Sequence, residues 1–173
     1  MTIDRRFISL GIAVLTVSDS RTLANDISGQ TLVDRLITAG HRLVDRQIVP
    51  DDIYRIRAIV SSWIVEPEVQ VILTTGGTGV TGRDGTPEAV SVLFDKTLDG
   101  FGEMFRSLSY QEIGTSTLQS RALAGVANGT YLFCLPGSSS ACRTGWDLLI
   151  ATQLDFRTRP CNLVELMPRL LER

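Results

Sequence analysis

Apolar residues along the 173-residue chain fall into short runs separated by longer segments of helical periodicity. Residues 8–17, 69–75 and 130–136 are nearly continuous apolar stretches, and the first of them is rich in β-branched residues, a pattern typical of strands buried on both faces of a sheet. Residues 41–50 alternate between polar and apolar positions, which predicts an edge strand. Strands separated by helices form right-handed β-α-β units, so the pattern predicts a parallel sheet.

Helices are predicted in the intervening segments, over 29–39, 50–66, from 86 onward, over 99–124 with irregular parts, over 138–154, and as a short terminal helix in 158–173. Ser28 is the expected N-cap of the first helix and Gly40 its end. Either Asp51 or Asp52 is expected to cap the second. Pro87 suits the first turn of the third, where its missing N–H costs nothing.

These elements predict one domain over residues 1–173, folded as a three-layer α/β/α sandwich with a mostly parallel sheet. Neither a linker nor a repeat interrupts the chain, and 43% hydrophobic residues are enough for a core. Phe101, Phe105 and Tyr110 are expected in that core rather than at an interface.

Composition leaves few classes of partner open. The chain has 17 basic and 19 acidic residues, so neither nucleic acid nor a membrane surface is expected as a partner. The three cysteines form no CxxC pair and His41 is the only histidine, which argues against zinc. Sparse cysteines and a short N-terminal apolar run indicate a cytoplasmic protein. Lys96, the only lysine, is expected at a solvated helix end.

Three strands end in loops that carry chemistry, with the sequences TVSDSR, TTGGTGVTGRDGTPEA and LPGSSSA. Ligands of open α/β sheets bind beyond the carboxyl ends of the strands, so the three loops are expected to meet in one pocket. The serines of the third loop offer hydroxyl and N–H groups to an anion. A serine nucleophile is not supported, because it would need a histidine base nearby and the single histidine, His41, belongs to the opposite end of its strand.

The second loop contains Gly76, Gly77, Gly79 and Gly82. Glycine tolerates positive φ and lets backbone N–H groups approach a ligand closely, so this loop is expected to hold phosphate beside a helix N-terminus. Its spacing matches neither GxGxxG nor the P-loop GxxxxGK[ST], and a tight strand-to-helix crossover is the alternative interpretation.

Carboxylates accompany these loops. Asp84 beside a phosphate site implies a bridging cation, and Mg²⁺ takes one or two carboxylates together with water and phosphate oxygens. The alternative is that Asp84 caps a helix or forms a turn. Whichever of Asp51 and Asp52 does not cap the helix is free for a metal or a nucleophile, unless both are exposed turn residues. Arg83 is equally consistent with phosphate pairing and with solvent.

Together these motifs resemble the MogA and MoaB family of molybdenum cofactor biosynthesis proteins, and most closely its MoaB branch. The motifs TVSDSR, VPDD, TTGGTG, RDGTPEA and LPGSSSA occur in the family's order between residues 10 and 160, and GFGEMFRSLS, EIGTSTLQSRALAGV and TRPCN resemble MoaB in particular. The resemblance implies a molybdopterin-binding fold in homotrimers or homohexamers. The implied reaction is Mg²⁺- and ATP-dependent adenylylation of molybdopterin, with release of pyrophosphate.

Carried over position by position, the resemblance makes Asp51 and Asp84 the catalytic and Mg²⁺-binding residues. The implied substrate-binding residues come from all three loops and are Ser18, Asp19, Ser20, Gly76, Gly77, Thr78, Gly79, Thr86, Pro136, Gly137, Ser138 and Ala141. Many relatives have lysine or asparagine where this chain has Ser140, and Arg143 is the candidate replacement.

Two functions follow from the sequence. The first is a molybdopterin adenylyltransferase that uses ATP, although no motif distinguishes ATP from GTP. The second is a non-catalytic carrier or scaffold that holds molybdopterin or a nucleotide in the same pathway. In either case other molybdenum cofactor biosynthesis proteins are the expected protein contacts.

Overall fold

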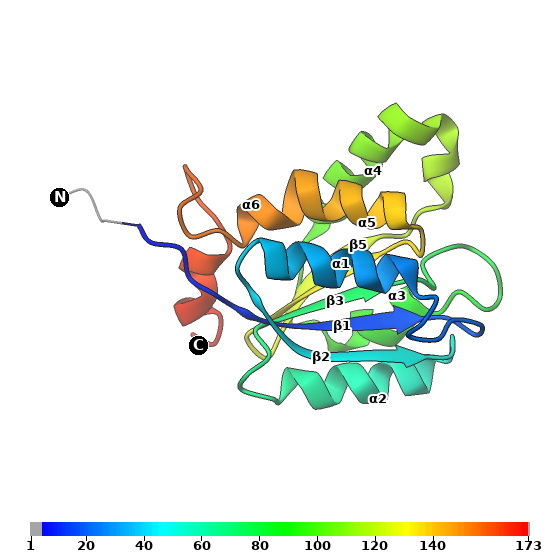
Figure 1. Cartoon of the computed structure of the whole chain (residues 1–173), viewed down its shortest axis with the longest axis horizontal. Helices are drawn as coiled ribbons and strands as arrows, with labels where there is room; N and C mark the ends of the chain where they lie inside the picture. Colours follow the sequence, from blue (N-terminus) through cyan, green and yellow to red (C-terminus); the bar gives the residue numbers. More distant parts are fainter. Residues whose placement is uncertain (1–4, 173) are drawn as a thin grey trace.

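A six-stranded sheet forms the centre of the computed structural model, which describes residues 5–172 (Figure 1). Its strands are β1 (Gly11–Val17), β2 (Arg42–Val49), β3 (Val71–Thr75), β4 (Lys96–Thr97), β5 (Leu123–Ala127) and β6 (Thr130–Leu135), in the order β2-β1-β3-β6-β5-β4. The β1–β2, β1–β3 and β3–β6 pairs are parallel, whereas β5 pairs antiparallel with both β6 and β4. The prediction of a mostly parallel sheet is confirmed. Of the predicted domain 1–173, residues 1–4 and 173 lie outside the described part.

Helices connect the strands and cover both faces of the sheet. They are α1 (Ile27–Thr38), α2 (Ile53–Ile64), α3 (Thr86–Val90), α4 (Asp99–Ile113), α5 (Ser139–Gly145) and α6 (Ala151–Gln153), with one turn of π-helix (Trp146–Ile150) joining α5 to α6 and short 3₁₀ segments at Ser91–Leu93, Gly114–Gln119 and Val164–Arg169. The helix predicted over 138–154 is thus a continuous helical stretch. Within residues 5–172 no helix has the length and apolarity that crossing a bilayer requires.

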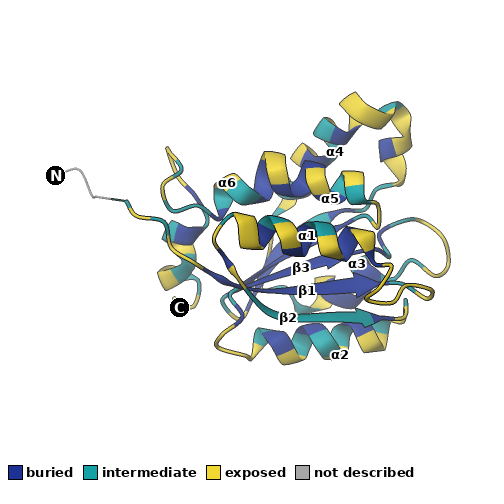
Figure 2. Cartoon of the chain, in the orientation of Figure 1, coloured by how far each residue is buried: buried dark blue, intermediate teal, exposed yellow. Residues whose placement is uncertain are grey.

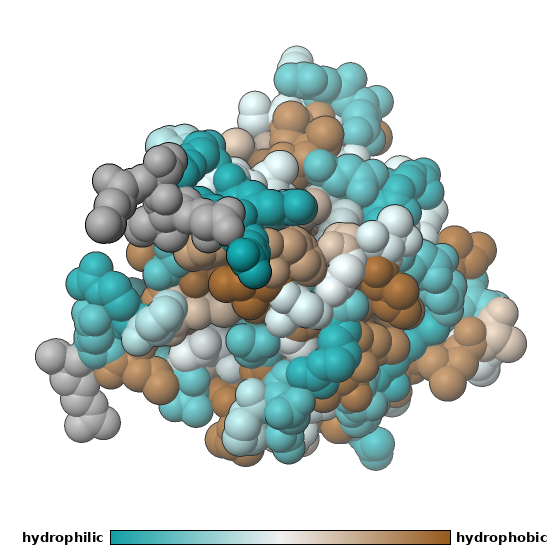
Figure 3. Space-filling model, turned by 60° about the vertical axis from the view of Figure 1, so that its left-hand side comes forward, coloured by the Kyte–Doolittle hydropathy of each residue, from teal (hydrophilic) through white to brown (hydrophobic). Residues whose placement is uncertain are grey.

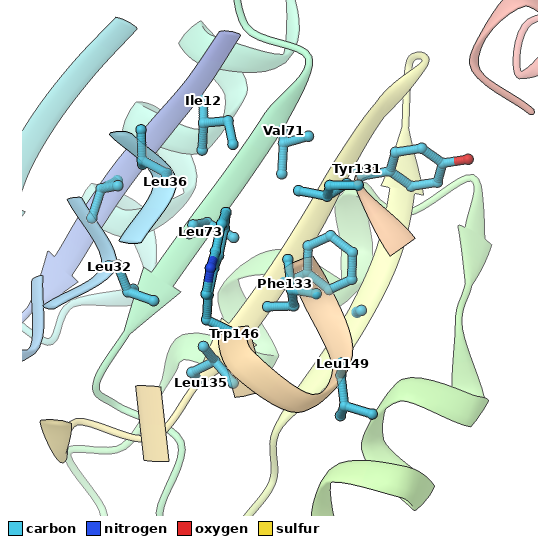
Figure 4. Packing of buried hydrophobic residues seen from close by; sticks show 14 of the residues in the cluster. Ile12, Leu32, Leu36, Val71, Leu73, Tyr131, Phe133, Leu135, Trp146 and Leu149 are labelled. Carbon is cyan, nitrogen blue, oxygen red and sulfur yellow. The ribbon is translucent and has the colours of Figure 1, made fainter. Parts of the chain in front are cut away.

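Two apolar clusters, one on each face of the sheet, make the fold a three-layer sandwich. On one face Ile12, Leu73 and Phe133 pack under α1 and the helical stretch that carries Trp146 (Figure 4). On the other face Leu15 belongs to a cluster that includes residues of α2 and α3. Figure 2 shows the consequence, with β1 and β3 buried and β2 at intermediate exposure, as its edge position requires.

The antiparallel part of the sheet was not predicted. Residues 123–127 form β5 rather than the end of a helical region, and Lys96 lies in the short exposed strand β4 rather than at a helix end. Asn128 and Gly129 link β5 to β6 with φ of 48° and 80°. Positive φ at both central residues is characteristic of the two-residue hairpin turn that Asn-Gly favours.

Helix caps confirm part of the prediction and correct the rest. The N-cap of α1 is Asp26 and not Ser28, because the Asp26 carboxylate accepts from the Gly29 N–H at 2.9 Å and also from the Thr16 hydroxyl at 2.7 Å. Asp52 caps α2, which leaves Asp51 free. Gly40 follows α1 with φ of 92°, a conformation that suits glycine.

Candidate functional site

A pocket of 580 Å³ lies at the carboxyl ends of the parallel strands, on the side of the molecule away from the two termini (Figure 1). All three predicted loops line it, so their expected convergence is confirmed. Of the predicted site residues, the pocket is lined by Ser18, Asp19, Asp51, Gly76, Gly77, Thr78, Gly79, Asp84, Pro136, Gly137, Ser138 and Ala141. A view turned toward the left-hand side of Figure 1 shows apolar and polar side chains interspersed among the described residues (Figure 3).

The structure does not place Ser20 and Thr86 in the pocket lining. Ser20 is exposed, and its N–H donates to the Ser18 hydroxyl at 3.2 Å within a turn. Thr86 is fully buried behind the glycine loop, where its hydroxyl donates to the Gly76 carbonyl at 2.9 Å. Thr86 therefore shapes the pocket without lining it.

The glycine loop directs its carbonyl groups into the protein. The carbonyls of Gly76 and Gly77 accept from the hydroxyl and N–H of Thr86, and those of Thr78 and Gly79 accept from the N–H and side chain of Arg121. Within residues 5–172, the N–H groups of Gly77 and Thr78 have no acceptor. Unpaired N–H groups beside a pocket form an anion-binding nest.

Positive φ at two positions makes this arrangement accessible to glycine alone. Gly76 has φ of 103° and Gly77 has φ of 67°. A Cβ on Gly76 would lie 2.2 Å from the Val17 carbonyl oxygen, and one on Gly77 would lie 2.3 Å from the Thr86 hydroxyl oxygen. The loop therefore packs against both β1 and α3 with no room for a side chain.

Asp51 lies in the short connection between β2 and α2, and its carboxylate lies beside the glycine loop. Its Oδ1 accepts from the Gly85 N–H at 3.1 Å, and its Oδ2 receives no hydrogen bond from the described residues. Burial raises the pKa of Asp51, and the nearby charges of Asp84 and Asp19 raise it further. A carboxylate with these neighbours is stabilised by a cation.

Asp84 is held differently. Its Oδ2 accepts from the Thr81 N–H at 2.8 Å and from the Thr81 hydroxyl at 2.7 Å. The bond from the Thr81 hydroxyl is the main cause that lowers the pKa of Asp84, so this carboxylate stays ionised. The turn that Asp84 forms with Thr81 fixes the position of the charge at the pocket.

Arg83 forms a two-pronged ion pair with Asp19, through Nε to Oδ2 at 3.0 Å and Nη2 to Oδ1 at 2.6 Å. The same Asp19 carboxylate accepts from the Asp51 N–H at 3.0 Å. Arg83 thus contacts a carboxylate of the first loop, and through it the first loop, the glycine loop and the β2–α2 connection are joined. The Arg83 side chain is nevertheless 65% exposed at the mouth of the pocket.

The third loop lies directly against the glycine loop. The Gly76 N–H donates to the Leu135 carbonyl at 3.0 Å, and a Cβ on Gly137 would approach the Gly76 Cα to 3.3 Å. Ser138 caps α5 by accepting from the Ala141 N–H at 3.1 Å. Ser140 lines the pocket, whereas Arg143 is not among its lining residues.

The remaining wall comes from α4 and the 3₁₀ segment after it, which the sequence analysis did not assign to the site. It consists of Phe105, Ser109, Glu112, Ile113, Ser116, Gln119 and Ser120. The Thr144 hydroxyl, on the facing α5, donates to Glu112 at 2.7 Å. The spacing of 105, 109 and 112 places these residues on one face of α4, and Ser116 follows in the 3₁₀ segment. The polar residues Ser109 and Glu112 on that face were the available signal.

Comparison with known proteins gives this geometry a context. Residues 13–155 match the family described as "Probable molybdopterin binding domain". The chain belongs to this family. Molybdenum cofactor biosynthesis protein B of Escherichia coli K12 is 57% identical over 160 residues, which cover 92% of this chain and 94% of the relative. The protein of the same name from Bacillus cereus is 45% identical over 146 residues, or 84% and 86% of the two chains.

Solved structures of molybdenum cofactor biosynthesis proteins share the fold. A crystal structure of molybdenum cofactor biosynthesis protein B superposes with a TM-score of 0.83 at 44% identity, over 85% of this chain and 92% of the other. The tungsten cofactor synthesizing protein MoaB from Pyrococcus furiosus gives a TM-score of 0.74 at 38% identity, over 83% and 91%. The predicted family and the predicted molybdopterin-binding fold are therefore confirmed.

The resemblance to the MogA and MoaB family implies Mg²⁺ as a cofactor. The oxygen atoms of the carboxylates at the pocket fit this ion. The described residues contain no group of three or more histidine, cysteine or carboxylate side chains able to hold a metal by themselves. Mg²⁺ does not require such a cage, because it binds through one or two carboxylates and completes its shell with water and phosphate. Asp51 and Asp84 would provide two hard oxygen ligands beside the N–H groups of the glycine loop.

Proposed function

We propose that the chain catalyses the Mg²⁺- and ATP-dependent adenylylation of molybdopterin. In this reaction an oxygen of the terminal phosphate of molybdopterin bonds to the α-phosphorus of ATP. The bond from that phosphorus to the bridging oxygen breaks, and pyrophosphate leaves with the electron pair. The observation that carries the proposal is the meeting of a backbone anion nest with Asp51 and Asp84 in one pocket.

The reaction requires positioning and charge neutralisation more than covalent chemistry by the protein. The N–H groups of Gly77 and Thr78 are free to donate to phosphoryl oxygens, and they are fixed before a ligand arrives. Asp51 and Asp84 would hold Mg²⁺, which neutralises phosphate charge when bound. No lysine is required, because the backbone and the metal take over its electrostatic role.

The size of the pocket and the relatives' names support molybdopterin as substrate. A volume of 580 Å³ lies within the range of small-molecule sites. The matched family is described by molybdopterin binding, and the relatives are named for molybdenum cofactor biosynthesis. The polar face of α4 faces the phosphate-binding loops across the pocket and offers hydroxyl and carboxylate groups to the organic part of a ligand.

The test is to incubate the purified protein with molybdopterin, ATP and Mg²⁺ and to measure pyrophosphate and adenylylated pterin. Asp84→Asn keeps the shape of the side chain but removes its charge, so turnover should be lost while the fold and much of the pterin binding remain. Asp52→Asn is the matched control, because Asp52 caps α2 outside the pocket lining. GTP in place of ATP measures nucleotide preference.

Absence of both products from the wild-type protein, with tight pterin binding in calorimetry, would replace the enzyme by the carrier alternative. Unchanged turnover in Asp84→Asn would restrict Asp84 to forming the turn with Thr81. The homotrimer or homohexamer implied by the resemblance is part of the proposal, and analytical ultracentrifugation measures it.

A further inference from the structure

We propose that Arg121 is the positioning residue of the glycine loop: it holds residues 78–84 in the shape that presents the Thr78 N–H and the Asp84 carboxylate to the pocket. Arg121 itself is not among the lining residues. It lies between the 3₁₀ segment after α4 and β5. Its role in turnover rests on the proposed function, whereas its role in anion binding can be measured without turnover.

Three contacts of Arg121 reach backbone carbonyls on both arms of the loop. Its N–H donates to the Thr78 carbonyl at 3.0 Å, and its Nε donates to the Gly79 carbonyl at 2.7 Å. Its Nη2 donates to the Asp84 carbonyl at 2.9 Å. One residue therefore connects the chain entering the loop with the chain leaving it.

The same guanidinium pairs with Glu88 in the first turn of α3, through Nη1 and through Nη2 at 3.3 Å. Loop and following helix are thus held by one planar group. Gln119 and Ser120, which directly precede Arg121, line the opposite wall of the pocket. Arg121 consequently fixes the distance between that wall and the glycine loop.

The loop carries its own turn between Thr81 and Asp84, and Arg121 adds support from outside that turn. A Cβ on Gly82 would meet nothing within 4 Å, so the tip is open, and four glycines leave the backbone with much conformational freedom. Hydrogen bonds from Arg121 to the carbonyls of Thr78, Gly79 and Asp84 select the conformation in which the Thr78 N–H remains available. This selection requires a planar fork with several donors in fixed directions, which arginine has and lysine lacks.

Two simpler roles compete with positioning. Arg121 could act only as a positive charge near the phosphate site, or only as the ion-pair partner that stabilises α3. A charge-only role predicts that lysine substitutes for arginine. An ion-pair-only role predicts that loss of the Glu88 charge is as harmful as loss of Arg121.

The experiment compares Arg121→Lys and Arg121→Ala with two controls, Glu88→Gln and Arg57→Ala. Arg57 is a matched control because its guanidinium also donates to two backbone carbonyls, those of Ala89 and Glu88, but away from the pocket. Each variant is examined by its melting temperature, by kcat and KM for adenylylation, and by calorimetric titration with inorganic pyrophosphate and Mg²⁺.

Arg121→Lys should remain folded, lose about 100-fold in kcat with a smaller change in KM, and bind pyrophosphate more weakly. Glu88→Gln should keep most of its adenylylation turnover and most of its pyrophosphate binding. Arg57→Ala should lower the melting temperature without changing turnover or pyrophosphate binding. Wild-type kcat and pyrophosphate binding in Arg121→Lys would overturn the proposal, as would equal losses in Glu88→Gln and Arg121→Ala. If Arg121→Ala does not fold, the comparison of Arg121→Lys with Glu88→Gln still distinguishes positioning from the two simpler roles.

A wild-type protein that binds pyrophosphate without turning over ATP would contradict the proposed function and not the role of Arg121. In that case the calorimetric comparison of wild type with Arg121→Lys decides: weaker binding in the variant supports positioning, and equal binding refutes it.

Discussion

Replacement of Gly77 by alanine tests the claim that the glycine loop is built for backbone donors. Gly77 has φ of 67°, in the left-handed region. A Cβ there would lie 2.3 Å from the Thr86 hydroxyl oxygen, 2.8 Å from Asp51 Oδ2 and 3.1 Å from Val17 Cγ1. Because Thr86 is fully buried and bonded to the Gly76 carbonyl, its side chain can move only by breaking that bond.

Two effects add to the cost of Gly77→Ala. Placing a residue with a Cβ in the left-handed region costs about 1–2 kcal/mol. Leaving the buried Thr86 hydroxyl or its carbonyl partner without a hydrogen bond costs about 1–3 kcal/mol. The free energy of unfolding should therefore fall by about 2–5 kcal/mol, and the displaced Asp51 carboxylate should also reduce turnover.

Urea denaturation of Gly77→Ala and Gly82→Ala measures this difference within one loop. Gly82 does not have positive φ, and its added Cβ would meet nothing within 4 Å. Gly82→Ala should change stability by less than about 1 kcal/mol, and reduced freedom of the unfolded chain makes a small gain the expected sign. Equal stabilities for the two variants would refute the inference that Gly77 is tightly packed in a left-handed conformation.

The titration of Asp51 and the helix cap at Asp52 give two further predictions. Burial and the charges of Asp84 and Asp19 raise the folded-state pKa of Asp51 above its ordinary value of 3.8, so its contribution to stability is present below pH 3.8 and is lost as pH rises through the raised pKa. Asp51→Asn should therefore raise the melting temperature at pH 7 but not below pH 3.8, and a lower melting temperature at pH 7 would show that the carboxylate is structural. Asp52→Ala removes the cap of α2 and should reduce the free energy of unfolding by about 1 kcal/mol in chemical denaturation with turnover unchanged; a loss of turnover would give Asp52 a part in the site.

The parallel half of the sheet could be predicted because β1, β3 and β6 are apolar runs, β2 alternates as an edge strand does, and each strand is followed by a turn and a helix. The antiparallel half was not predicted, because β5 has the sequence LAGVA. This sequence is short and rich in small residues, which do not indicate a strand. The better signal was the Asn-Gly pair at 128–129, which favours a two-residue hairpin between flanking apolar runs.

The candidate site was predictable where it depends on residue type and less so where it depends on three-dimensional packing. Glycines and carboxylates in the strand-end loops indicated the side of the pocket that these loops form. The wall from α4 was missed because ordinary serines on a helix resemble a solvated face until the fold brings them opposite the loops. Local sequence also cannot choose between Asp26 and Ser28 as N-cap, since both types cap helices; contact with Thr16 on β1 decides for Asp26. Tyr110 was wrongly expected in the core, because it is 59% exposed, whereas Phe105 is buried.

The inward-facing carbonyls of the glycine loop have a consequence for how the site can be mapped. The groups left to meet a ligand at Gly77 and Thr78 belong to the main chain, and truncation of a side chain does not remove them. A conventional alanine scan will therefore emphasise the carboxylates and overlook the donors opposite them. Exchange of single amide linkages for esters would delete one N–H at a time and reveal how much of ligand recognition resides in the backbone itself.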